Sequence, residues 1–145
     1  MTSQLSKVFE IIMVANDGST QSLHATNVAF SLAEALHSKL QILTVIQLPK
    51  PAIRAEVNAI LDKANEDWER SFESLRERAK EKNIELETEI AIGHPAKQIV
   101  SRADVIDANL IILGGHKIST LQRWMPGSVS DDVLRNARCP VMVVQ

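Results

Sequence analysis

The stretch Leu110-Ile111-Ile112-Leu113-Gly114-Gly115-His116-Lys117 joins a short apolar run to a glycine turn and a polar loop. Four consecutive apolar residues bounded by turn residues are typical of a strand that is buried on both faces. After the loop, Gly127-Ser128 opens a helical pattern. A helix N-terminus has unpaired N–H groups and a partial positive charge, so it favours anions, phosphate above all. We therefore expect the functional site in the last third of the chain.

A second apolar run, Ile11–Ala15, has the same character and ends in the turn residues Asn16-Asp17-Gly18-Ser19. Residues 41–46 and 141–144 are also apolar enough to predict buried or half-buried strands. Between Glu85 and Ile92, apolar and polar residues alternate. This alternation predicts a half-exposed strand at an edge of the sheet.

Helical periodicity separates these five strands. A long amphipathic pattern extends from Ile53 to Ala79, and Pro95 suits the first position of a later helix. Strands that alternate with helices, joined by right-handed crossovers, predict an α/β fold with a doubly wound five-stranded parallel sheet and helices on both faces. The other helices are predicted around Ala25, Ala29, Leu32 and Leu36, and from Ser128 to Asn136.

The composition narrows the class of protein. A length of 145 residues predicts a single domain, 1–145, and a net charge of −2 without a basic cluster argues against nucleic acid as a partner. No apolar run is long enough for a membrane span, and the first residues lack the apolar core of a signal peptide. Cys139 is the only cysteine, and no histidines have metal-ligand spacing. We expect a cytoplasmic protein without a structural metal.

The predicted burial of the strands also gives their order. The alternating strand belongs at an edge, and the two most buried strands, Ile11–Ala15 and Leu110–Leu113, belong in the centre. The order 3-2-1-4-5 satisfies both conditions and places the switch point between strands 1 and 4. Ligands of such sheets bind at the carboxyl ends of the strands beside the switch point. The turns at 16–19 and 114–117 then face one crevice.

Each candidate residue also fits a purely structural role. Gly114 suits a simple turn from strand to loop. Ser128, with Asp131 three residues later, suits a helix N-cap. Asp17 suits an Asx turn or a cap of the first helix, and His116 suits an ordinary loop residue without an activating partner.

Five segments together carry a resemblance to a known family. They are IMVANDGS at 12–19, GHPA at 93–96, LIILG at 110–114, GSV at 127–129 and CPVMVV at 139–144. In this order and spacing they resemble the universal stress proteins over nearly the whole chain. The family has one branch that binds ATP or AMP and one that does not.

The chain resembles the nucleotide-binding branch in a sequence pattern. This pattern is a glycine, two residues, a second glycine, nine residues, and a third glycine followed by serine or threonine. Gly114, Gly127 and Ser128 fit the outer positions, and Lys117 stands in place of the middle glycine. A lysine backbone resists the conformations that glycine allows, whereas its ammonium group can hold a phosphate as a point charge. We expect binding to be retained, with ATP or AMP as the ligand, with or without Mg.

The resemblance also implies roles for individual residues. Asp17 would meet the ribose or the adenine side, lined by Ala15 and Asn16, and the backbone of Val45 would contact adenine. The phosphates would lie between Gly114, His116 and Lys117 on one side and Gly127, Ser128, Val129 and Ser130 on the other. The resemblance also implies a homodimer that is joined through the last strand. Val141–Val144, an apolar strand at the far edge of the predicted sheet, suits such pairing.

Three functions remain open from the sequence. The first is a stress-related regulatory protein that binds an adenine nucleotide and acts as a dimer. The second is a dimeric interaction protein whose site is vestigial. The third is a slow ATPase or phosphotransferase, but the sequence supplies neither a clear catalytic base nor a Walker-type loop, so we do not expect an enzyme.

Overall fold

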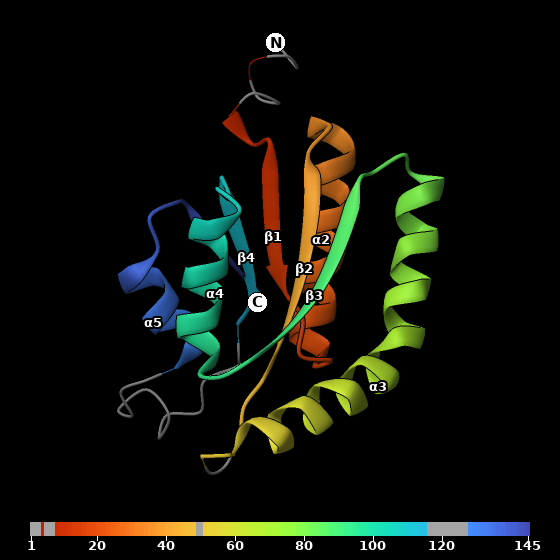
Figure 1. Ribbon diagram of the computed structural model, residues 1–145. Helices are drawn as coiled ribbons and strands as arrows, with labels where there is room; N and C mark the ends of the chain where they lie inside the picture. The colour runs from red at the N-terminus through yellow and green to blue at the C-terminus, as the bar shows by residue number, and fades with distance from the viewer. Residues whose placement is uncertain (1–3, 5–7, 49–50, 116–127) are drawn as a thin grey trace.

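The computed structural model describes residues 4, 8–48, 51–115 and 128–145. Within them, five strands form one parallel sheet in the order β3-β2-β1-β4-β5 (Figure 1). The predicted fold class and strand order are confirmed. The strands are β1 (Ile11–Ala15), β2 (Lys39–Ile46), β3 (Leu86–Ile92), β4 (Leu110–Gly114) and β5 (Val141–Val144).

Four helices within the described residues lie on the two faces of this sheet (Figure 1). α2 (Thr20–Leu36) and α3 (Arg54–Glu81) pack on one face, and α4 (Pro95–Val105) and α5 (Val129–Asn136) pack on the other. β2 begins two residues before the predicted start, because the amide of Lys39 donates to the carbonyl of Glu10 and so extends the pairing with β1. The start of β2 is therefore set by backbone hydrogen bonding to β1, although Lys39 is a polar residue.

Each face of the sheet has its own apolar core. On the first face, α2 buries Ala25, Ala29 and Ala33 beside Phe30. Alanines at this spacing let the helix backbone lie close to the central strands. The second core has larger residues from strands β1, β2 and β4 against α4 and α5: Met13, Leu43, Ile111, Leu113, Ile99 and Val133.

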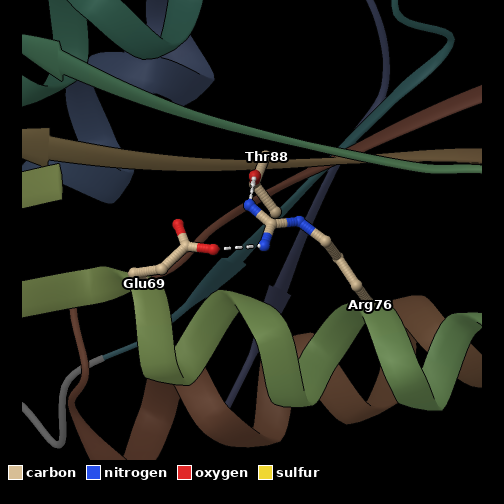
Figure 2. Close-up of polar contacts among 3 residues, drawn as sticks. All are labelled: Glu69, Arg76 and Thr88. Atoms are coloured by element: carbon tan, nitrogen blue, oxygen red, sulfur yellow. Dashed lines mark hydrogen bonds and ion pairs between the residues drawn. The ribbon is translucent and has the colours of Figure 1, made fainter. Parts of the chain in front are cut away.

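Helix α3 is held more loosely than α2. Of its 28 residues, all described, only Ala64, Phe72 and Ala79 are buried. Figure 2 shows how the helix is tied to the edge strand: the guanidinium of Arg76 donates to Thr88 Oγ1 at 3.2 Å and to Glu69 Oε1 at 2.7 Å. No helix in the described ranges is long and apolar enough to cross a membrane.

The helices α2, α3 and α4 end in the same way at the amino end of the sheet. Each is followed by a residue in the left-handed conformation: His37, Asn83 and Asp107 have φ of 55°, 56° and 55°. The next amide then donates to a carbonyl five residues earlier, which closes the helix in a Schellman motif. These bonds run from Ser38 to Ala33, from Ile84 to Ala79 and from Ala108 to Ala103, at 3.0, 2.8 and 2.9 Å.

Candidate functional site

A cavity of about 320 Å³ opens at the carboxyl ends of β1, β2 and β4. This is the switch point of the sheet, where chain connections leave in opposite directions. The structure brings seven predicted site residues together in its lining, whereas His116, Lys117 and Gly127 lie outside the described residues. The seven are Ala15, Asn16, Asp17, Val45, Gly114, Val129 and Ser130. Ser128 immediately precedes Val129 as the N-cap of α5.

The lining also contains residues that sequence reasoning did not assign to the site. Apolar residues at the ends of strands, such as Leu43 and Leu113, have the pattern of ordinary core. Ser19 and Pro95 were recognisable as residues at helix starts, and every helix start beside the switch point faces the crevice. That signal would have found them. The unassigned lining residues are Ser19, Ser22, Leu43, Gln47, Pro95, Ile99 and Leu113.

The loop between β1 and α2 is built around Asn16, which is 2% exposed. Its Oδ1 accepts hydrogen bonds from the amide of Gly18 at 3.0 Å and from Ser22 Oγ at 3.1 Å. Its backbone carbonyl accepts from Thr44 Oγ1 at 2.7 Å, and its amide donates to Leu43 at 2.9 Å. Asn16 therefore fixes the loop to β2, and its amide oxygen is committed to the protein rather than to a ligand.

Asp17 lies at the mouth of the cavity and is exposed. Its Oδ1 accepts from the amide of Ser19 at 2.9 Å, which is an Asx turn. Ser19 Oγ in turn accepts from the amide of Ser22 at 3.2 Å and caps α2. Among the described residues of the lining, Asp17 is the one ionisable side chain. The carboxylate of Asp17 therefore both stabilises the turn before α2 and lines the cavity.

Gly114 is the last residue of β4, where it pairs with Val144, and its φ is not positive. A turn conformation therefore does not explain the glycine. A Cβ at this position would lie 2.5 Å from the carbonyl carbon of Gln21 and 2.7 Å from the amide nitrogen of Ser22. Real Cβ atoms essentially never approach backbone so closely, so glycine is needed because the first turn of α2 lies directly on β4.

Three helices begin beside the cavity: Ser19, Pro95 and Val129 line it at the starts of α2, α4 and α5. The described first turns of α2 and α4 contain no acidic residue. The first turn of α5 contains Asp131, whose amide donates to Ser128 Oγ at 3.1 Å, so the expected N-cap is present. Converging N-termini create a positive potential that favours an anion.

The backbone of Val45 faces the cavity for a reason that follows from strand geometry. In parallel sheets the peptide groups of successive residues point alternately to the two neighbouring strands. The carbonyl of Leu43 accepts from Asn16 on the β1 side, and that of Ile46 accepts from Gly93 on the β3 side. The N–H and C=O of Val45 therefore point to the β1 side, beyond the residue at which β1 has ended.

A second hollow, of about 360 Å³, lies at the opposite end of the sheet. Asp104, Arg138 and Cys139 are among the residues that line it. Burial raises the pKa of the Cys139 thiol, and the nearby charge of Asp104 raises it further. A raised pKa makes the thiol a poor nucleophile at neutral pH. In the part of the chain that the structure describes, no three or more His, Cys, Asp or Glu side chains are grouped to hold a metal ion.

Comparisons with known proteins agree with this geometry. The model of the universal stress protein family matches residues 9–145. A universal stress protein of Methanocaldococcus jannaschii is 30% identical over 141 residues, which cover 95% of this chain and 83% of that protein.

Solved structures show the same fold. A universal stress family protein from Burkholderia pseudomallei is 26% identical with a TM-score of 0.74, over 94% of this chain and 96% of the other. A universal stress protein in complex with cAMP is 29% identical with a TM-score of 0.68, over 94% of this chain and 97% of the other.

Proposed function

The chain belongs to the universal stress protein family, whose members are stress-related proteins, and we propose that it binds an adenine nucleotide in the cavity between β1, β2 and β4. The observation that carries the proposal is the cavity of about 320 Å³, which gathers seven residues that the family resemblance assigns to the nucleotide. The relative in complex with cAMP supports the same ligand class.

The adenosine part of the ligand has a suitable place in this cavity. Leu43, Val45 and Ile99 give an apolar surface for the base, and the outward N–H and C=O of Val45 can pair with its polar edge. Asp17 lies at the mouth, where its carboxylate can accept hydrogen bonds from the ribose hydroxyls. A carboxylate suits these hydroxyls better than it suits a phosphate.

The phosphates of ATP or AMP belong at the start of α5. Val129 and Ser130 occupy the first helical turn, where amides and the helix dipole favour negative charge. We assign Gly114, Ser128, His116, Lys117 and Gly127 to the same group, with Lys117 as a point charge for the phosphate tail. Asp131 and Asp132 in this turn oppose a highly charged ligand. We therefore expect AMP to bind at least as tightly as ATP without Mg.

Calorimetric titration of the purified protein with AMP, ATP and cAMP tests the proposal. Asp17→Ala should weaken AMP binding by roughly tenfold to a hundredfold, because hydrogen bonds to a charged group are lost. Asp62→Ala, at an exposed aspartate of α3 that is not part of the cavity lining, is the matched control and should leave the affinity unchanged. No heat and no thermal stabilisation at millimolar nucleotide would instead favour a dimeric interaction protein with a vestigial site.

We further propose that the protein forms a homodimer through β5. This strand lies at an edge of the sheet, and its side chain Met142 is 37% exposed. An apolar edge with unpaired backbone groups invites a second copy. Met142→Lys should shift the protein to monomer in sedimentation experiments. Val105→Lys, at a 64% exposed position on α4, is the control and should leave the dimer intact.

A further inference from the structure

Trp68, in the middle of α3, lies close to the loop that carries Asp17. A Cβ placed on Gly18 would lie 3.5 Å from Cη2 of Trp68, an ordinary van der Waals contact. Gly18 follows Asp17 directly and has φ of 84°, a conformation that glycine alone adopts readily. The far corner of the indole ring is therefore the neighbour of the loop on its α3 side.

The indole itself is held in place by the core. Its ring centroid lies 5.8 Å from that of Phe72, which is 4% exposed. One turn further on, Arg76 ties α3 to Thr88 of β3 (Figure 2). Because these contacts restrict the movement of α3 and of the indole ring, the ring can limit the movement of the neighbouring loop.

We infer that Trp68 is a positioning residue for the nucleotide site, an inference that rests on the function proposed above. From the cavity side, Asn16 Oδ1 holds the amide of Gly18 at 3.0 Å. On the α3 side, the space beside Gly18 holds about a methyl group before Cη2 of Trp68 is reached, so Trp68 limits how far Gly18 can move toward α3. Restricted from these two sides, the loop keeps Asp17 at the mouth of the cavity, where we propose that it binds the ribose.

Trp68 also lies behind a second wall of the cavity. Together with Ile46 it lines a hollow of about 420 Å³ between α3 and the end of β2. Ile46 is flanked by Val45 and Gln47, which line the nucleotide cavity. Trp68 therefore lies beside both the loop that carries Asp17 and the end of β2 that lines the cavity.

The substitution Trp68→Phe tests the effect of Trp68 on the position of the Asp17 loop separately from its packing in the core. The smaller ring keeps an aromatic contact with Phe72 but is too short to reach Gly18. Calorimetric titration with AMP should show about tenfold weaker binding. In the Asp17→Ala background the same substitution should weaken AMP binding by less than about twofold, because Trp68 acts through Asp17. Leu75→Ala, in the same helix and core, is the control: it should lower stability without changing affinity.

The outcomes separate the inference from the function on which it rests. An unchanged AMP affinity in Trp68→Phe overturns the inference and leaves nucleotide binding intact. Equal losses with and without the Asp17→Ala substitution also overturn it, because a merely structural role would give additive effects. If the unsubstituted protein binds no AMP, both proposals fail. Non-additive losses, with Leu75→Ala unchanged in affinity, support the role of Trp68.

Discussion

The two ends of the sheet contain hollows of similar size, about 320 and 360 Å³, but their polar groups are used differently. At the amino end, backbone polar groups form hydrogen bonds within the protein. Asn109 Oδ1 accepts from the amide of Ile11, and Schellman motifs close three helices. At the carboxyl end, helix starts and the backbone of Val45 face the cavity. The direction of the helices, more than the presence of polar side chains, therefore distinguishes the end of the sheet that is suited to an anionic ligand.

The largest effect is expected at the carboxyl end, where β4 and α2 are in direct backbone contact. Gly114→Ala should lower the free energy of unfolding by about 3 kcal/mol, because the added Cβ would lie 2.5 Å from the carbonyl carbon of Gln21 and would force α2 away from the sheet. Urea unfolding of the variant measures this loss.

Gly115→Ala is the matched control for that substitution. Its Cβ would meet Val143 Cγ1 at 2.9 Å and Gln145 Nε2 at 3.2 Å, which are side-chain atoms. Side chains adjust more easily than a helix backbone, so the loss should be clearly smaller than for Gly114→Ala. Equal losses at the two positions would contradict the special role of the contact between α2 and β4.

The two asparagines allow a direct test of the comparison. Asn16→Ala removes an acceptor of two hydrogen bonds and should cost about 2 kcal/mol of stability, whereas Asn109→Ala removes one and should cost about 1 kcal/mol. Only Asn16→Ala should also weaken AMP binding. Chemical denaturation and calorimetry provide the two readouts, and a loss of affinity in Asn109→Ala would break the distinction between the ends.

At the amino end, one substitution should be favourable. His37 has φ of 55°, a conformation that costs most residues about 1 kcal/mol relative to glycine. His37→Gly should raise the free energy of unfolding by about 0.5 kcal/mol, after the greater freedom of glycine in the unfolded chain is subtracted. Asn83→Gly should give less, because asparagine tolerates the left-handed region. Neither variant should change nucleotide affinity, and a change would show that the two ends are coupled.

The smallest effect concerns Cys139. The pKa of this thiol is raised in the folded protein, first by burial and then by Asp104, so the unfolded chain ionises at lower pH. Its stabilising contribution is therefore fully present below about pH 8.5, the pKa of an unperturbed thiol, and is lost as pH rises through the folded value. Unfolding between about pH 8 and 10.5, compared with Cys139→Ala, should show a steeper decline for the unsubstituted protein. Parallel declines would contradict it.

Local patterns were enough to predict the sheet. The alternation in residues 85–92 predicted an edge strand, and the apolar runs that became β1 and β4 predicted the centre. The position of the cavity followed from these two results, because the switch point of a parallel sheet is fixed by strand order.

Long-range contacts could not be predicted in the same way. Gly114 is required by the backbone of α2, and Trp68 lies close to Gly18 although about fifty residues of chain separate them. Neither contact leaves a periodic or spaced signal in the sequence. Asn16 was expected at the cavity and lies there, but its hydrogen bonds to Gly18 and Ser22 depend on how the loop folds back on α2.

The close approach of α2 to β4 has a consequence for how lineages of this fold change. Because the backbone of Gln21 excludes any side chain at position 114, selection for a folded chain is enough to retain glycine there. A chain with this packing would keep the glycine whether or not it bound a nucleotide. Glycine at position 114 is therefore explained by the packing of α2 on β4, and its presence alone says nothing about a ligand.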